Sequence, residues 1–177
     1  MNRGTYSEEE IEALITGTER GLIRFAMRYL KDHAGACDAV QDAYIRYVRF
    51  LQGPPPGVVE NPGAWLFRTT RNICLDILKS ARMRLNVSLD AEPDSGSGAV
   101  APGADAASVR KDDVALARSL FESLNERERE IVILKMEHDK SYKEIAEIMN
   151  LTVSNVGFIL HGALKKLRNA YREKELL

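Results

Sequence analysis

The stretch from Ser141 to Arg172 reads SYKEIAEIMNLTVSNVGFILHGALKKLRNAYR, and its pattern decides how the C-terminal part of the chain folds. Ser141, followed three residues later by Glu144, forms a capping box, which predicts the start of a helix. Asn150 breaks the apolar pattern and tolerates the left-handed conformation of a tight turn. Thr152 can cap a second, longer helix. Together these signals predict a helix-turn-helix.

The second of these helices has two distinct faces when its residues are placed about 100° apart. The apolar face consists of Val156, Leu160, Ala163, Leu164 and Leu167. The opposite face consists of Ser154, Phe158, His161 and Lys165. Every charged residue from Thr152 to Arg172 is basic, which suits a helix that lies in a DNA groove. The alternative is an amphipathic helix packed within an ordinary helical domain.

Charge is distributed unevenly along the 177 residues, whose formal net charge is −1. The length allows one domain or two small ones. The near-neutral total argues weakly against a nucleic-acid-binding protein. However, residues 63–86 carry five basic residues against the single acid Asp76, and residues 87–113 carry six acids against two basic residues. A basic surface is therefore expected to be local.

The cysteines and histidines form no recognisable site. Cys37 and Cys74 make neither a zinc ribbon nor a C-x-x-C pair, so both are interpreted as small apolar residues of the core. His33, His138 and His161 are scattered, and we find no phosphate-binding loop or nucleophile elbow. We therefore expect no catalytic residue, no metal site and no cofactor. No apolar run resembles a signal peptide or a membrane span, so a reducing cytoplasm is the expected compartment.

The N-terminal part of the chain is expected to begin with helix. Ser7 and Glu10 form a capping box, and helical spacing of the apolar residues continues to Tyr29. Gly17 and Gly21 weaken a helix at these positions, so the pattern fits two short helices as well as one long helix. A turn is expected around residues 31–35.

A second helix is expected over Ala34–Leu51, with one apolar and one polar face. The buried stripe consists of Ala36, Val40, Ala43, Tyr44, Tyr47, Val48 and Leu51. The other face consists of Asp38, Gln41, Asp42, Ile45 and Arg49. Ile45 is an apolar residue on this polar side, which fits either a single exposed side chain or a contact with another protein.

A third helix is expected after the loop that begins with Gly53-Pro54-Pro55-Pro56-Gly57, and Pro62 suits its first turn. Its apolar face consists of Leu66, Thr70, Ile73, Ile77 and Ala81. Its opposite face consists of Arg68, Arg71, Asn72, Leu75, Lys79 and Arg82. Because almost no acids interrupt this basic stripe, we favour a nucleic-acid contact over a merely solvated face.

The pattern then collapses into Gly, Ser, Ala, Pro and Asp between Leu85 and Asp113, which is typical of a flexible linker. Helix is expected again from about Asp113, and Asn125 with Glu128 forms a further capping box. No strand pattern and no internal repeat are found. The sequence therefore predicts an all-α protein of two small helical domains joined by a flexible linker.

Three stretches resemble bacterial RNA polymerase sigma factors of the extracytoplasmic-function type. DAVQDAYIRYVRF, Asp38–Phe50, resembles the core-binding helix of that family. NPGAWLFRTTRNICLDILKSAR, Asn61–Arg82, resembles its promoter-melting helix. LNEREREIVILK followed by SYKEIAEIMNLTVSNVG resembles sigma region 4.

The resemblance implies a non-catalytic protein that binds core RNA polymerase, directs it to promoters and helps to open the duplex. It implies a region 2 domain over residues 1–86, a flexible linker over 87–112 and a region 4 helix-turn-helix domain over 113–177. The implied polymerase contacts are Asp38, Gln41, Asp42 and Ile45. The implied contacts near the −10 element are Arg68, Asn72, Asp76, Lys79 and Arg82. The implied contacts at the −35 element are Thr152, Ser154, Asn155, Phe158, His161 and Lys165.

The resemblance extends to a loop and to a further partner. The loop Gly53–Asn61 occupies the place where the family captures a flipped base of the non-template strand. Trp65 is interpreted as core packing rather than as a stacking platform. An anti-sigma factor is an additional candidate partner, because such proteins often hold members of the family inactive. A helix-turn-helix regulator that never joins polymerase stays open as an alternative.

The recognition helix departs from the family pattern. The family usually carries V-K-S-R-L-H-R-A where this chain has Val156–Ala163. The three positions that are usually basic are therefore occupied here by Gly157, Ile159 and Gly162. We therefore expect weak −35 recognition, with an apolar contact from Phe158 to thymine. The alternative is a surface that has been given over to a protein partner.

Overall fold

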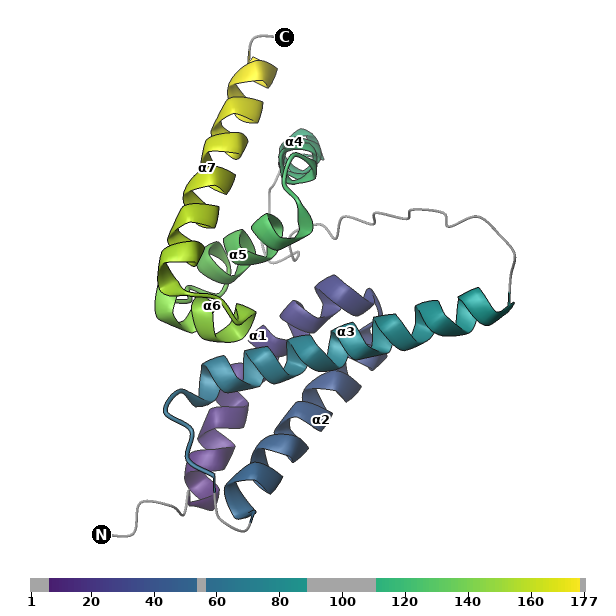
Figure 1. Ribbon diagram of the computed structural model, residues 1–177, viewed down its shortest axis with the longest axis vertical. Helices are drawn as coiled ribbons and strands as arrows, with labels where there is room; N and C mark the ends of the chain where they lie inside the picture. The colour runs from purple at the N-terminus through teal and green to yellow at the C-terminus, as the bar shows by residue number, and fades with distance from the viewer. Residues whose placement is uncertain (1–6, 54–56, 89–110, 176–177) are drawn as a thin grey trace. The chain divides into compact units, whose positions relative to one another are not determined.

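All regular secondary structure in the described part of the chain is helical. The computed structural model describes residues 7–53, 57–88 and 111–175. The helices are α1 (Glu8–Leu30), α2 (His33–Gln52), α3 (Pro62–Ser88), α4 (Lys111–Glu122), α5 (Glu126–Met136), α6 (Tyr142–Met149) and α7 (Val153–Glu175). The chain divides into two compact units, Met1–Asp94 and Ser95–Leu177. The predicted all-α, two-domain fold is confirmed (Figure 1).

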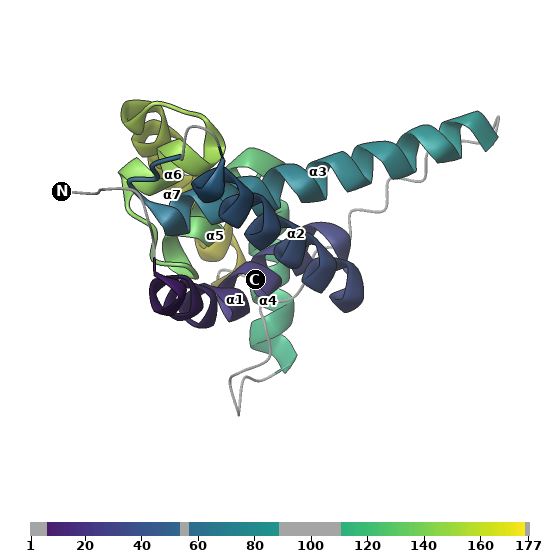
Figure 2. The same ribbon diagram turned by 90° about the horizontal axis from the view of Figure 1, so that it is seen from below.

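In the first unit α1, α2 and α3 pack against one another around a shared core. Both views show α3 continuing at its C-terminal end beyond the other two helices (Figures 1 and 2). Leu22 and Phe25 of α1, Tyr47 of α2 and Leu66 of α3 are among the largest fully buried side chains. The unit is thus a three-helix bundle.

One long helix, not two short ones, forms the start of the chain. The capping box predicted at Ser7 and Glu10 is present, and α1 runs without interruption to Leu30. Gly17 and Gly21 each weaken a helix by about 1 kcal/mol relative to alanine. Burial of the α1 core residues against α2 and α3 outweighs that penalty, since burial of one large apolar side chain contributes about 1.5–3 kcal/mol.

The turn between α1 and α2 has caps on both sides. Lys31 ends α1 in the left-handed conformation, with φ 55° and ψ 12°. Asp32 caps α2, and its carboxylate accepts a hydrogen bond of 2.8 Å from the Gly35 N–H. α3 begins at Pro62, as predicted, and the Asn61 side chain caps it by accepting a bond of 2.9 Å from the Ala64 N–H.

Several predicted core residues are less buried than the helical pattern indicated. Ile77 is 42% exposed, and Tyr44 and Val48 are only half-buried. Cys74 is buried as predicted, and burial raises the pKa of its thiol to about 12. Cys37, however, is only partly buried, with its Sγ 3.6 Å from His33 Nδ1. The interpretation of both cysteines as core residues therefore holds for Cys74 alone.

The predicted linker is partly helical at its ends. α3 continues to Ser88 and α4 begins at Lys111, so residues 87–88 and 111–112 belong to helices. Residues 89–110 lie outside the described residues, and so do residues 54–56 of the proline-rich loop.

In the second unit α7 packs against α4, α5 and α6. The capping boxes predicted at Asn125 with Glu128 and at Ser141 with Glu144 are both present. The core is formed by Ile131, Leu134, Ile145, Ile148, Val156, Leu160 and Ala163. None of the helices in the described residues has a stretch long and apolar enough to cross a membrane.

Candidate protein and nucleic-acid interfaces

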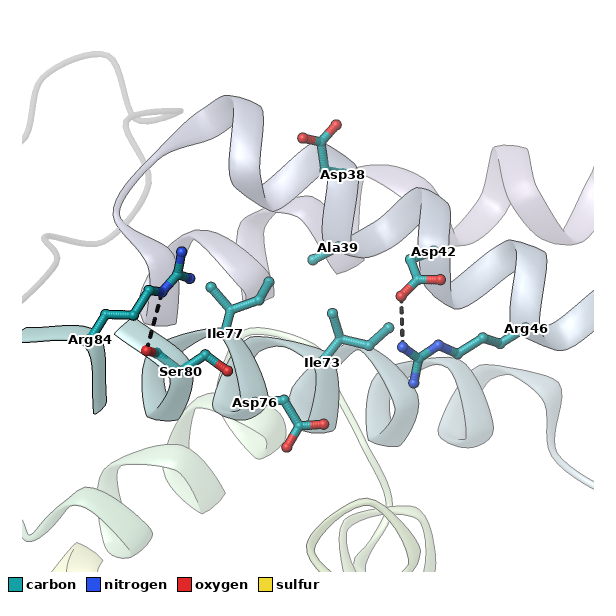
Figure 3. Close-up of a pocket in the computed structure, with 9 residues that line it drawn as sticks. All are labelled: Asp38, Ala39, Asp42, Arg46, Ile73, Asp76, Ile77, Ser80 and Arg84. Atoms are coloured by element: carbon teal, nitrogen blue, oxygen red, sulfur yellow. Dashed lines mark hydrogen bonds and ion pairs between the residues drawn. The ribbon is translucent and has the colours of Figure 1, made fainter. Parts of the chain in front are cut away.

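An open groove of about 430 Å³ lies between α2 and α3 (Figure 3). Three acids line it: Asp38 and Asp42 from α2, and Asp76 from α3. Apolar side chains from both helices line it as well, namely Ala39, Ile73 and Ile77. Ser80, Arg46 and Arg84 complete the lining. The groove therefore combines an apolar surface with three carboxylates and two guanidinium groups, which suits a charged and partly apolar protein segment.

The three carboxylates differ in what they already bind. Asp42 Oδ2 lies 2.8 Å from the Arg46 guanidinium, one helical turn further along α2. About half of each side chain in this pair is exposed, so the interaction adds little to stability and can be exchanged for another partner. Asp38 and Asp76 are exposed and have no ion pair within the part of the chain that the structure describes. These two acids are available to a partner.

The residues predicted to contact polymerase share one exposed region of α2. Asp38 and Gln41 are exposed, Asp42 is partly exposed, and Ile45 is 48% exposed. Asp38 and Asp42 line the groove, whereas Gln41 and Ile45 are not part of its lining. An exposed isoleucine beside acids gives this face an apolar contact within a charged rim, which is the usual anatomy of a protein interface.

The residues predicted to contact DNA near the −10 element form a stripe on α3. At 100° per residue Arg68, Asn72, Asp76, Lys79 and Arg82 fall within an arc of about 120°. All of them are exposed except Arg68, which is half-buried. Asp76 stands at one edge of this stripe and also lines the groove. The acidic face of α2 therefore continues into the basic stripe of α3.

An aromatic cluster sits where α2 ends and α3 begins. The Trp65 ring centroid lies 5.3 Å from that of Tyr47 and 5.9 Å from that of Phe50. Trp65 is half-buried, in keeping with packing, while Phe50 is 44% exposed. The helical pattern of α2 gave no role to Phe50. Its position three residues after Tyr47, next to the glycine-proline loop, is the signal that could have identified it.

Gly57, which lies between these two helices, is held against the same cluster. The Gly57 N–H donates a hydrogen bond of 2.9 Å to the Phe50 carbonyl. A Cβ at position 57 would overlap with the Phe50 ring, so the backbone at Gly57 lies directly against that ring. Val59 is buried, whereas Val58 is 71% exposed. The end of α2 and the residues before α3 thus expose an aromatic ring, that of Phe50, and an apolar side chain, that of Val58.

The helix-turn-helix has the local geometry that the sequence predicted. Asn150 ends α6 in the left-handed conformation, with φ 53° and ψ 55°. Thr152 Oγ1 accepts a hydrogen bond of 3.2 Å from the Asn155 N–H and caps α7. All six residues predicted at the −35 element are exposed: Thr152, Ser154, Asn155, Phe158, His161 and Lys165. They extend from the cap of α7 at Thr152 to the middle of the helix at Lys165.

One of the basic residues at the end of α7 has a structural partner that sequence reasoning missed. Lys166 Nζ lies 2.8 Å from Glu128 Oε1, so α7 is tied to the first turn of α5. The hydrogen bonds from Lys166 hold the pKa of the Glu128 carboxyl below its ordinary value, against an opposing effect of burial.

Among the described side chains no group of three or more potential metal ligands is found.

Two regions of the chain match known protein families. Residues 14–84 match the family described as Sigma-70 region 2, and residues 115–167 match Sigma-70, region 4. The described helices of these two segments are the three-helix bundle and the helix-turn-helix unit.

Curated relatives agree with this pair of matches. The probable ECF RNA polymerase sigma factor SigI of Mycobacterium tuberculosis is 30% identical over 152 residues, which cover 84% of this chain and 51% of SigI. The chain thus spans about half the length of that relative. The ECF RNA polymerase sigma factor SigM of Bacillus subtilis is 24% identical over 148 residues, which cover 84% of this chain and 86% of SigM.

Two solved structures share the fold. One is the sigma factor RpoE in complex with the anti-sigma factor NepR from Bartonella quintana, with a TM-score of 0.67 and 19% identity over 93% of this chain and 98% of that chain. The other is CnrH in complex with the cytosolic domain of CnrY, with a TM-score of 0.60 and 19% identity over 94% of this chain and 90% of that chain.

Proposed function

The chain belongs to the sigma-70 factors of the extracytoplasmic-function class, and on that premise we propose that it binds core RNA polymerase and directs it to promoters. In this proposal residues 1–86 bind polymerase and the −10 element, and residues 113–177 bind the −35 element. Residues 87–112 connect the two. This role requires no catalytic residue in the chain. We place the protein in the cytoplasm, where bacterial transcription occurs.

The observation that carries the proposal is the continuity between α2 and α3. Asp38 and Asp42 line the same groove as Asp76, which borders the basic stripe. A protein bound to the α2 face and a DNA strand bound to the α3 stripe would therefore lie next to each other. A helix-turn-helix regulator that acts without polymerase has no need for such a joint surface.

The α2 face supplies the polymerase contacts. We assign them to Asp38, Gln41, Asp42 and Ile45. Exposed carboxylates attract a basic partner and set its orientation, while Ile45 contributes apolar area at the contact. Asp42 would exchange its exposed bond to Arg46 for a bond to polymerase.

The α3 stripe supplies the contacts near the −10 element. Arg68, Lys79 and Arg82 pair with phosphates, which provides affinity without reading sequence. Asn72 and Asp76 have the hydrogen-bonding groups that read base edges. The loop beside Phe50 and Val58 is the place for a base that leaves the stack, since exposed apolar surface there can replace lost stacking.

The start of α7 supplies the −35 contacts at Thr152, Ser154, Asn155, Phe158, His161 and Lys165.

An anti-sigma factor is a further proposed partner. The similar RpoE and CnrH structures each hold a second protein, which in the case of RpoE is an anti-sigma factor.

A binding assay with purified core RNA polymerase tests this proposal. The full chain, carrying an affinity tag, is expected to retain core polymerase on a column, and a second sigma factor in excess is expected to displace it. A regulator that acts without polymerase would bind DNA but retain no core. That result would exclude the sigma function while leaving the helix-turn-helix intact.

A further inference from the structure

The outward surface of α7 has an unusual composition for a helix that enters a DNA groove. From Val153 to Leu164 the helix contains no Lys or Arg. The most exposed large apolar side chain on it is Phe158, which is 80% exposed. Its exposed neighbours Ser154 and His161 are polar, and the first basic residue on this face is Lys165.

Packing within the unit does not explain Phe158. The buried side of α7 is supplied by Val156, Leu160 and Ala163, which are at most 3% exposed. Phe158 projects from the other side of the helix and leaves most of its ring in water. An exposed aromatic ring at the centre of a polar face is the kind of side chain that a binding partner covers.

The two glycines near Phe158 are not required by the fold. A Cβ at position 157 would meet only ring carbons of Tyr142 at 3.7 and 3.9 Å, which is ordinary contact, and a Cβ at position 162 would meet nothing within 4 Å. Glycine in the middle of a helix weakens it. The consequence of having glycine at both positions is a narrow helix surface from which the Phe158 ring projects.

We propose that Phe158 is a specificity-determining residue that reads thymine through its C5-methyl group in the major groove of the −35 element. This inference rests on the proposed function. The thymine methyl group is the apolar group among the base-pair features of the major groove, and an aromatic ring can contact it but cannot bond to guanine. The first cationic side chain on the same face is Lys165, seven residues further along, so few charged contacts to phosphate support this contact and it is selective but weak.

Replacing thymine by uracil removes the methyl group and changes nothing else in base pairing. The full chain, alone and with core polymerase, selects from duplexes randomised over about ten base pairs and amplified with either dTTP or dUTP. We expect thymine to be enriched at one or two positions in the dTTP pool only. The selected duplex is expected to bind about fourfold more tightly than its uracil counterpart for each methyl group contacted.

Variants of Phe158 assign the effect to this residue. Phe158→Ala is expected to bind the thymine and uracil duplexes equally. Phe158→Leu is expected to retain part of the preference for thymine, because an apolar side chain remains. Tyr171→Ala, which changes another exposed aromatic residue of α7, is expected to leave the ratio unchanged. Circular dichroism of each variant verifies that the helices are intact.

Equal binding of thymine and uracil duplexes by the unmodified protein would overturn the inference. So would a ratio that survives Phe158→Ala, or a complete absence of duplex selection, which would mark the surface as a protein contact. In each of these cases continued binding to core polymerase would leave the proposed function standing. A chain that selects thymine but never binds core would contradict the proposed function instead.

Discussion

Lys166 of α7 donates two hydrogen bonds to Glu128 of α5, at 2.8 Å to Oε1 and 2.9 Å to Oε2. Glu128 Oε2 also accepts a hydrogen bond of 3.0 Å from the Asn125 N–H and so completes the capping box of α5. One carboxylate therefore caps one helix and fixes the recognition helix against it. This ion pair therefore adds a charge-dependent contact to the apolar packing between α5 and α7.

Removing the charge of Glu128 is expected to make the stability of the second unit less dependent on pH. The pKa of Glu128 is lower in the folded protein than in the unfolded chain. Its contribution to stability is therefore fully present above the pKa of the unfolded chain and is lost as pH falls through the pKa of the folded protein. Glu128→Gln keeps a capping side chain but loses the charge. Hydrogen exchange of α5 and α7 amides should show a steeper loss of protection from about pH 5 to pH 3 in the unmodified protein than in this variant.

Lys166→Ala supplies the comparison at neutral pH. The Lys166 side chain is 50% exposed, so we expect destabilisation of only about 0.5–1 kcal/mol. Lys165→Ala, next to it and exposed, should leave the exchange unchanged. Equal pH profiles for Glu128→Gln and the unmodified protein would show that the ion pair has no linkage to folding.

Replacing Asp38, Gln41 and Asp42 together with alanine is expected to weaken binding to core polymerase about tenfold or more. These side chains are wholly or partly exposed, so circular dichroism should be unchanged. Replacing Glu9 and Glu12, two exposed acids of α1, is the matched control and should have little effect. Full affinity after the triple replacement would remove the α2 face from the interface.

Replacing Lys79 and Arg82 with alanine is expected to impair promoter opening more than core binding. If both residues pair with phosphates, the variant has a shallower dependence on salt, so its deficit is largest at low salt and shrinks as salt rises. Permanganate reactivity of melted thymines measures opening, and core affinity serves as the internal control. A deficit that stays constant from low to high salt would argue against phosphate contacts.

Gly57→Ala is expected to displace the Phe50 ring, because the new Cβ would overlap with it. Trp65 is the only tryptophan in the chain and lies 5.9 Å from Phe50, so its fluorescence reports the movement. We expect a shifted emission spectrum and weaker promoter opening. In a double-mutant cycle with Phe50→Ala the two effects should be non-additive, since the smaller side chain relieves the overlap. Additive effects would show that loop and ring act independently.

The local signals of this sequence were strong, and the structure confirms them where they depend on neighbouring residues only. The caps at Ser7, Asn125 and Ser141 and the left-handed turn at Asn150 follow from hydrogen bonds within a few residues. The single helix α1 was not decided by its sequence, because the burial that overrides two glycines involves residues of other helices.

Features that join distant segments could not be predicted in the same way. The α2–α3 groove depends on which faces of two helices meet, and Ile77 lies in its open lining instead of in the core. The sequence places Lys166 among the basic residues of α7, and nothing within its own helix indicates Glu128 as its partner. The roles assigned to the interface residues stay predictions.

Transcription in vitro measures directly whether the chain acts as a sigma factor. Purified core RNA polymerase and the full chain are incubated with fragments of the source genome, and RNA 5′ ends are mapped. We expect initiation at discrete sites that requires the chain and is lost when Asp38, Gln41 and Asp42 are replaced. Core polymerase that initiates no more specifically with the chain than without it would show that the chain is not a sigma factor.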